Sequence, residues 1–299
     1  MIALMKILMA TDGSRDSAVA LRTAVRLLMP AERTLDILCV APRFAKRPGG
    51  NGLREEYERR ILRQITQILE RARASVASHA GNVNLLTEIG SPSAAIVNRA
   101  EEYDLTVIGA KGGGSTAGLG PVAARVVEHA LGPVLVARES RREDGLRALI
   151  AVDGSSASLE AIETFRTLFD LTGAEVCLMH VAETPWIHLG LEDEWETYDE
   201  EDKEQSEAGV FEKEMVREGD TIIEQAREAL RSTRISVTTI IDEGNPADQI
   251  LSEADRGQYD LIVVGAVGTR DLKHSMLGSV SAKIARNASA SVLIVRESE

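Results

Sequence analysis

The chain has 299 residues, a formal net charge of −13 and an aromatic content of 3%. Its length exceeds the size at which one hydrophobic core is usual, so two domains with aliphatic cores are expected. The negative charge argues against a general nucleic-acid or anionic-membrane binder, because such binding needs clustered Lys and Arg.

The amino-terminal residues before Lys6 are too few for a signal peptide, and no apolar run reaches the roughly 18 residues that span a bilayer. Cys39 and Cys177 each lie in an apolar run, where a reduced, buried thiol is expected. The five histidines are scattered, so no metal site is expected. These features predict a soluble, cytoplasmic protein.

Three segments of the first half return in the same order in the second half. The pairs are Leu8–Ser14 with Leu149–Ser155, Tyr103–Ala110 with Tyr259–Ala266, and Val134–Ser140 with Val292–Ser298. Between the two copies lies a short charged joint that ends in Gly145, which is typical of a tight linker. We therefore place one domain at residues 1–141 and the other at residues 146–299.

Each copy alternates short apolar runs with amphipathic segments, a pattern that predicts βαβ units and a parallel sheet. In the second copy, strands are expected near Ala148–Val152, Glu175–Ala182, Ile235–Asp242, Asp260–Gly265 and Ser291–Val295. Helices are expected after Ser155, before the third strand, after Asn245-Pro246 and after Gly278-Ser279.

The fourth strand of the second copy runs into a loop with the spacing G-x2-G-x9-G-S, which contains Gly265, Gly268, Gly278 and Ser279. Glycines let backbone N–H groups approach an anion, and a helix N-terminus adds unpaired donors. Ligands of open α/β sheets bind outside the carboxyl ends of the strands. The loop therefore predicts a phosphate site, with a purely structural connection as the alternative.

Asp153 follows the first strand of the second copy, beside the fourth strand if the sheet is doubly wound. Its carboxylate can accept hydrogen bonds from a ribose or help to hold a metal ion. The alternative is that Asp-Gly-Ser is ordinary turn chemistry and that the side chain supports a helix cap.

Two further features stay open. Lys273 and His274 lie between Gly268 and Gly278, where they either contact a phosphate or belong to a surface loop. An acidic insertion covers about residues 184–220 and contains Trp186, Trp195, Tyr198 and Phe211. It is either a lid or partner surface or, as we prefer, a solvated acidic helix face with anchoring aromatics.

The ordered and partly duplicated set of motifs resembles two domains of the universal stress protein family in its tandem form, over nearly the whole chain. Val152-Asp153-Gly154-Ser155, the Tyr-Asp strand that runs into Gly265, and the G-x2-G-x9-G-S loop carry the resemblance. It implies an α/β fold of two tandem doubly wound domains, each a five-stranded parallel sheet between helices. This arrangement is Rossmann-like and similar to the adenine-nucleotide alpha-hydrolases.

The resemblance also implies that ATP or AMP, with Mg²⁺ as a candidate companion ion, lies between the first and fourth strands. Asp153 matches the family's ribose-side acid, and Val181 matches the position whose backbone contacts adenine. The implied nucleotide-binding residues are Asp153, Val181, Gly265, Gly268, Gly278, Ser279, Val280 and Ser281.

The first copy departs from the loop pattern, since only seven residues separate Gly112 from Gly120 and Pro121 replaces the serine. Proline removes both the hydroxyl and a backbone N–H at the start of the helix. We therefore expect weaker binding in this copy. Its candidate residues are Asp12, Val40, Gly109, Gly112 and Gly120.

We therefore expect a stress-response regulator that binds ATP or a related adenine nucleotide mainly through its second domain and acts on protein partners. We find no positioned base, arginine finger or metal cluster, so at most a slow ATPase is expected. An interaction scaffold without useful nucleotide binding is the alternative. Because domains of this family pair through their last strands, the resemblance implies an intramolecular pseudo-dimer and leaves a homodimer open.

Overall fold

The computed structural model describes residues 5–28, 33–41, 51–76, 82–112, 118–140, 142, 145–183, 207–231, 233, 235–268 and 277–297. The first half contains β1 (Met5–Ala10), α1 (Arg15–Leu27), β2 (Arg33–Ala41), α2 (Asn51–Val76), β3 (Asn82–Ile89), α3 (Pro92–Ala100), β4 (Leu105–Gly109), α4 (Pro121–His129) and β5 (Val134–Ala137). The second half contains β6 (Arg147–Ala151), α5 (Ser156–Leu168), β7 (Glu175–Ala182), α9 (Glu207–Leu230), β8 (Ser236–Glu243), α10 (Pro246–Arg256), β9 (Leu261–Gly265), α11 (Ser279–Asn287) and β10 (Ser291–Val295).

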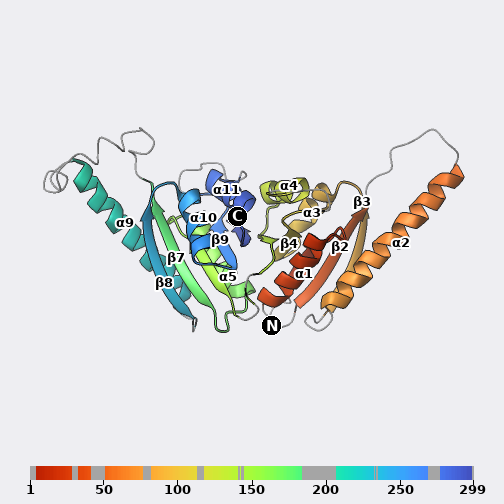
Figure 1. Cartoon of the computed structure of the whole chain (residues 1–299), viewed down its shortest axis with the longest axis horizontal. Helices are drawn as coiled ribbons and strands as arrows, with labels where there is room; N and C mark the ends of the chain where they lie inside the picture. The colour runs from red at the N-terminus through yellow and green to blue at the C-terminus, as the bar shows by residue number, and fades with distance from the viewer. Residues whose placement is uncertain are drawn as a thin grey trace.

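The described strands form one sheet in the order β3-β2-β1-β4-β5-β10-β9-β6-β7-β8 (Figure 1). Pairing is parallel within each half, and the two halves meet where β5 and β10 run antiparallel, with Leu135 opposite Leu293. The chain order reverses between β1 and β4 and again between β6 and β9. The predicted doubly wound α/β fold is confirmed, and the two five-stranded sheets are joined into one.

Helices cover both faces of the sheet, and each layer crosses the junction between the halves. Helices α1, α2, α5 and α9 pack on one face, whereas α3, α4, α10 and α11 pack on the other. Strand β1 shows the alternation that this requires, since Ile7 and Met9 face the first layer and Leu8 faces the second. The core is mainly aliphatic, with Phe165 and Phe169 as a ring pair 5.3 Å apart.

The five strands predicted for the second half are confirmed, with ends that differ by one residue. Strand β9 begins at Leu261 rather than Asp260, because Asp260 is bound to the start of β6. Its N–H donates to the Arg147 carbonyl at 2.9 Å, and its carboxylate accepts from the Arg147 N–H at 3.2 Å. Asp104 holds Lys6 in the same way in the first half.

The acidic insertion is described only in part. Its last residues, from Glu207, belong to α9, which packs on β7 and β8. Trp186, Trp195, Tyr198, Lys273 and His274 lie outside the described residues, as does the side chain of Phe211. None of the helices in the described part of the chain is long and apolar enough to cross a membrane.

Two arginines fasten the halves together by capping helices across the junction. Arg138, which follows β5, donates to the carbonyls of Ala285 (2.6 Å) and Ala290 (3.1 Å) around the end of α11. Arg296, which follows β10, donates to the carbonyls of Val127, Glu128 and Ala130 at the end of α4, at 2.6 to 3.1 Å. A cation at a helix C-terminus is favourable because the exposed carbonyls are partly negative.

Replacing Arg296 by methionine should lower the free energy of unfolding by roughly 2–4 kcal/mol, because hydrogen bonds from a charged group contribute about 1.5–3 kcal/mol each. Denaturant unfolding followed by circular dichroism measures this. The matched control is Arg73→Met on the exposed side of α2, which should change stability by less than about 0.5 kcal/mol. Equal effects of the two substitutions would contradict the capping role.

Candidate functional site

A cavity of about 530 Å³ lies over the carboxyl ends of β6, β7 and β9 in the second half. All eight residues predicted for this half line it, so the structure brings them together in one place. They are Asp153, Val181, Gly265, Gly268, Gly278, Ser279, Val280 and Ser281. The cavity lies where the strand order reverses between β6 and β9, which is the usual ligand position in doubly wound sheets.

The glycines of the loop allow contacts that a side chain would prevent. A Cβ atom on Gly265 would lie 2.9 Å from the carbonyl carbon of Ala157, because the start of α5 packs directly on the end of β9. A Cβ atom on Gly268 would lie 2.8 Å from Oδ2 of Asp153. These two glycines therefore keep the loop close to both α5 and the Asp153 carboxylate.

Helix α11 begins at this cavity with its backbone donors uncapped. Its N-cap residue is Gly278, and among the described residues no side chain caps the helix. The N–H of Gly278 donates to the Ala266 carbonyl at 2.7 Å, which fixes the end of the loop against β9. The N–H groups of Ser279 and Val280 in the first turn are thus suited to an anion.

Ser281 contributes differently from its neighbours in the first turn. Its hydroxyl donates to the Gly265 carbonyl at 2.6 Å, and the residue is buried. The side chain therefore joins α11 to the end of β9, and its hydroxyl proton is already used within the protein. Among the two serines of this turn, Ser279 is the better candidate for a hydroxyl contact with a ligand.

Asp153 combines the two roles that the sequence leaves open. Its Oδ1 accepts from the N–H of Ser155 at 3.1 Å and from the Ser155 hydroxyl at 2.6 Å, which is turn chemistry at the start of α5. Gly154 in this turn has φ of 77°, a conformation that favours glycine. The carboxylate nevertheless lines the cavity, with Oδ2 directed toward Gly268.

Several lining residues are absent from the sequence-based list. His180 is buried near the end of β7, and its Nδ1 donates to the Val152 carbonyl at 2.8 Å. Helix α9 adds Met215, Glu218 and Ile222, and Asn245 comes from the start of α10. His180 lies inside an apolar strand, and the α9 residues reach the cavity only when the chain folds. The local sequence pattern therefore does not mark any of them as a site residue.

The five candidates of the first half are the same residue types as their second-half counterparts, and their contacts are similar. Asp12 accepts from the Ser14 N–H at 2.9 Å, and Gly120 donates to the Ala110 carbonyl at 2.8 Å. A Cβ atom on Gly112 would lie 3.0 Å from Oδ2 of Asp12, and one on Gly109 would lie 3.0 Å from the Asp16 carbonyl oxygen. Val40 lies near the end of β2.

The first half lacks three polar side chains that line the second-half cavity, those of Ser279, Ser281 and His180. Pro121 stands at the first position of α4, and Ala123 stands where the second half has Ser281. Cys39 stands where it has His180. Burial, together with the nearby Asp12 carboxylate, raises the pKa of this thiol to about 11, so Cys39 is neutral at physiological pH.

Among the described residues, no group of three or more His, Cys, Asp or Glu side chains is arranged to hold a metal ion. The carboxylates around the second-half cavity are those of Asp153, Glu183 and Glu218.

Comparisons with known proteins agree with this arrangement. Residues 4–138 and residues 146–296 each match the profile of the universal stress protein family. A universal stress protein of Mycolicibacterium smegmatis is 26% identical, over 97% of this chain and 96% of its own length. Universal stress protein YxiE of Bacillus subtilis is 32% identical, over 50% of this chain and 98% of its own.

A crystal structure of a universal stress protein from Archaeoglobus fulgidus shares the fold, with a TM-score of 0.63 at 19% sequence identity. The match covers 99% of this chain and 100% of that one.

The substitution Gly265→Ala should lower the free energy of unfolding by roughly 1–3 kcal/mol, because the new methyl group meets α5 backbone that cannot move aside. Thermal and denaturant unfolding of the whole chain measure the change. The matched control is Gly90→Ala, since a Cβ there meets nothing within 4 Å, and it should be neutral or slightly stabilising. If Gly265→Ala were as harmless as the control, the close packing at the cavity floor would be wrong.

Proposed function

The chain belongs to the universal stress protein family, and we propose that it is a stress-response regulator that binds ATP or a related adenine nucleotide mainly through its second half. The observation that carries this proposal is the cavity that Asp153 lines together with Gly265, Gly268 and the uncapped start of α11. Its volume of about 530 Å³ lies within the range of small-ligand sites.

The order of the strands suggests how the nucleotide lies. Strand β6 stands between β9 and β7, so Asp153 at the end of β6 lies between the glycine loop and Val181. We place the phosphates at the glycine loop and at the first turn of α11, the ribose at Asp153, and the adenine at the backbone of Val181. A Mg²⁺ ion that accompanies a triphosphate belongs to the same proposal.

The donors at the start of α11 support phosphate binding for an electrostatic reason. Backbone N–H groups at a helix start carry partial positive charge, and their position is fixed by the hydrogen bond of Gly278 to Ala266. Fixed donors lose little entropy when a ligand binds. In the first half Pro121 removes one of these donors, which is why we assign the stronger site to residues 146–299 rather than to residues 1–141.

We propose binding rather than turnover as the function, with the bound state passed to protein partners through the surface around the cavity. Helix α9 is part of that surface, because Met215, Glu218 and Ile222 on it line the cavity. An interaction scaffold without nucleotide binding is the alternative. The two proposals differ in one measurable property, which is whether an adenine nucleotide stabilises the folded chain.

The first test is to denature the purified protein, identify any released nucleotide by mass, and measure thermal shifts with ATP, AMP, GTP and NAD. We expect stabilisation by adenine nucleotides, because a ligand that binds only the folded state adds about 2.7 kcal/mol at a hundred times its Kd. The absence of both a released nucleotide and an adenine-dependent shift would overturn the proposal and favour the scaffold.

The second test uses the difference between the two halves. Ser279→Pro gives the second half the Gly-Pro sequence of the first, and the helix should still form because proline is accepted at its first position. The affinity for ATP should fall by roughly tenfold or more, since one N–H and one hydroxyl are lost. Gly278→Val should likewise reduce ATP binding, whereas the matched change in the first half, Gly120→Val, should have little effect on it. Equal losses from the two halves would refute the assignment to the second half.

A further inference from the structure

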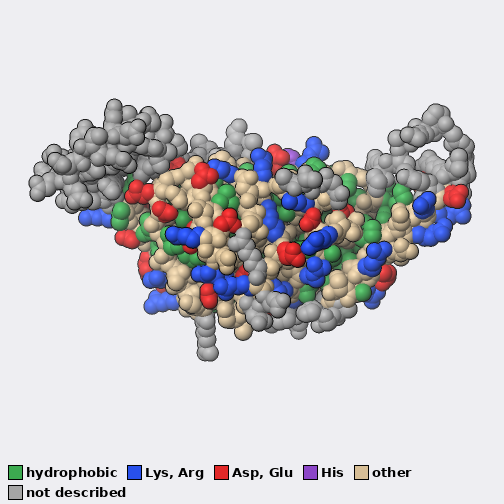
Figure 2. All heavy atoms as spheres, in the orientation of Figure 1, with side chains coloured by type: hydrophobic (Ala, Val, Ile, Leu, Met, Phe, Trp, Pro, Cys, Tyr) green, Lys and Arg blue, Asp and Glu red, His purple; other side chains and the backbone are tan. Residues whose placement is uncertain are grey.

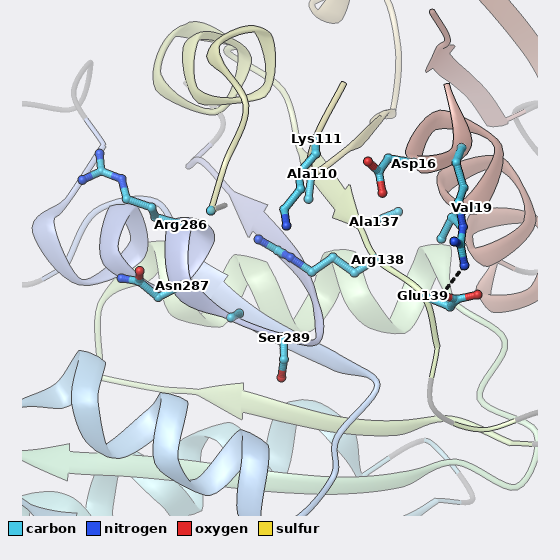
Figure 3. A pocket seen from close by; sticks show the side chains of 13 residues that line it. Asp16, Val19, Ala110, Lys111, Ala137, Arg138, Glu139, Arg286, Asn287 and Ser289 are labelled. Carbon is cyan, nitrogen blue, oxygen red and sulfur yellow. Dashed lines mark ion pairs between the residues drawn. The ribbon is translucent and has the colours of Figure 1, made fainter. Parts of the chain in front are cut away.

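A second cavity, of about 510 Å³, lies between the two halves and is separate from the proposed nucleotide site. Its walls come from α1 and the ends of β4 and β5 in the first half, and from the end of α11 in the second (Figure 3). It shares no lining residue with the second-half cavity. The five first-half candidates also lie outside its lining.

The lining of this interdomain cavity is cationic although the chain as a whole carries −13. Four basic side chains and two acidic ones line it: Arg15, Lys111, Arg138 and Arg286, with Asp16 and Glu139. Figure 2 shows basic and acidic side chains mixed together on the face that it presents. Arg15 begins α1 and Arg138 follows β5, so the fold brings together basic residues that lie far apart in the sequence.

Lys111 and Arg138 form the centre of this charge. In Figure 3 the ends of their side chains point toward one another across the cavity. The described hydrogen bonds of Arg138 to Ala285 and Ala290 use two of its five N–H groups and hold the guanidinium in place. Burial lowers the pKa of Arg138 to about 10, which leaves it charged at neutral pH. Two like charges directed at one space are stabilised by an anion between them.

The remaining charged groups lie around this centre. Arg15 pairs with Glu139 at 3.8 Å, but both side chains are mostly exposed, so the pair is weak. Arg286 lies at the edge, where its side chain extends away from Lys111 in Figure 3. Asp16, in the first turn of α1, is the acid nearest to the helix start, where the positive end of the α1 dipole partly offsets its charge.

The second copy of the domain provides an internal control for this charge. At the equivalent positions Ser156 replaces Arg15, Val267 replaces Lys111, and Glu128 replaces Arg286. Only Arg138 has a basic counterpart, which is Arg296, and both cap a helix of the other half. The capping arginine therefore occurs in both halves and has a structural role. The other three basic residues of the cavity are replaced by non-basic residues at the equivalent positions, so the fold does not require them.

We propose that the interdomain cavity binds a small, multiply charged phosphate anion, with Lys111 and Arg138 as its direct contacts. Arg's planar N–H groups and the lysine ammonium are the side-chain donors that phosphate oxygens prefer. Since residues of both halves line the cavity, a bound anion would hold α1 of the first half against α11 of the second. This inference does not depend on nucleotide binding in the second half.

The test uses the whole chain with Ser279→Pro, so that the proposed nucleotide site is weakened, and inorganic tripolyphosphate as the probe in isothermal titration calorimetry. We expect one anion per chain and an affinity that falls as salt is raised. Adding Lys111→Val and Arg286→Glu, which copies the residues of the other side, should weaken binding by roughly tenfold or more. Thermal unfolding without the anion checks that the variant is folded.

The charge-matched control is Arg60→Val with Arg73→Glu on the exposed side of α2, which should leave tripolyphosphate binding within about twofold. Equal losses in the control and the cavity variant would show nonspecific attraction and overturn the proposal. Absence of binding, or sulfate binding as tightly as tripolyphosphate, would also overturn it. ATP that competes with tripolyphosphate in this background would support the cavity and identify a nucleotide tail as the source of the phosphate.

Discussion

The antiparallel contact between β5 and β10 determines how the rest of the molecule is arranged. Every residue of both strands is buried, so each half alone would expose an apolar edge strand with unpaired backbone groups. Pairing the two edges removes that exposure and turns two five-stranded sheets into one sheet of ten. It also sends the chain beyond each strand toward the opposite half, which is why Arg138 reaches α11 and Arg296 reaches α4.

Helix α11 is consequently held at both ends by different parts of the molecule. Its start is joined to β9 through the Gly278 N–H and the Ser281 hydroxyl, and its end is capped by Arg138 of the first half. The uncapped donors that face the second-half cavity therefore belong to a helix whose position the first half helps to set. The second half itself fixes the start of α11, and the first half fixes its end, so both halves hold the helix in place.

The sequence was sufficient for the parts of this structure that depend on local pattern. Apolar runs predicted the strands of the second half, and the glycine spacing placed Gly265, Gly268 and Gly278 at one cavity. It was not sufficient for contacts between distant segments. Nothing near Arg296 signals that its partners are carbonyls of α4, and Asp260 reads as a strand residue although it binds the start of β6. His180 is hidden for a similar reason, because a polar residue in an apolar strand has no characteristic spacing.

The duplication separates positions that make the same contacts in both halves from positions at which the two halves differ. Asp104 and Asp260, which come directly before β4 and β9, make the same backbone contacts in the two halves. The two capping arginines are also equivalent, so the fold itself accounts for all four residues. Other equivalent positions differ although the backbone around them is alike: Pro121 with Ser279, Ala123 with Ser281, Cys39 with His180, and Lys111 with Val267. These positions lie near the carboxyl ends of the strands or in the first turns of α4 and α11. Because one fold supports both versions, we attribute the differences to the ligands that we propose for them: a nucleotide over β6 and β9, and a phosphate anion where the first half meets the end of α11.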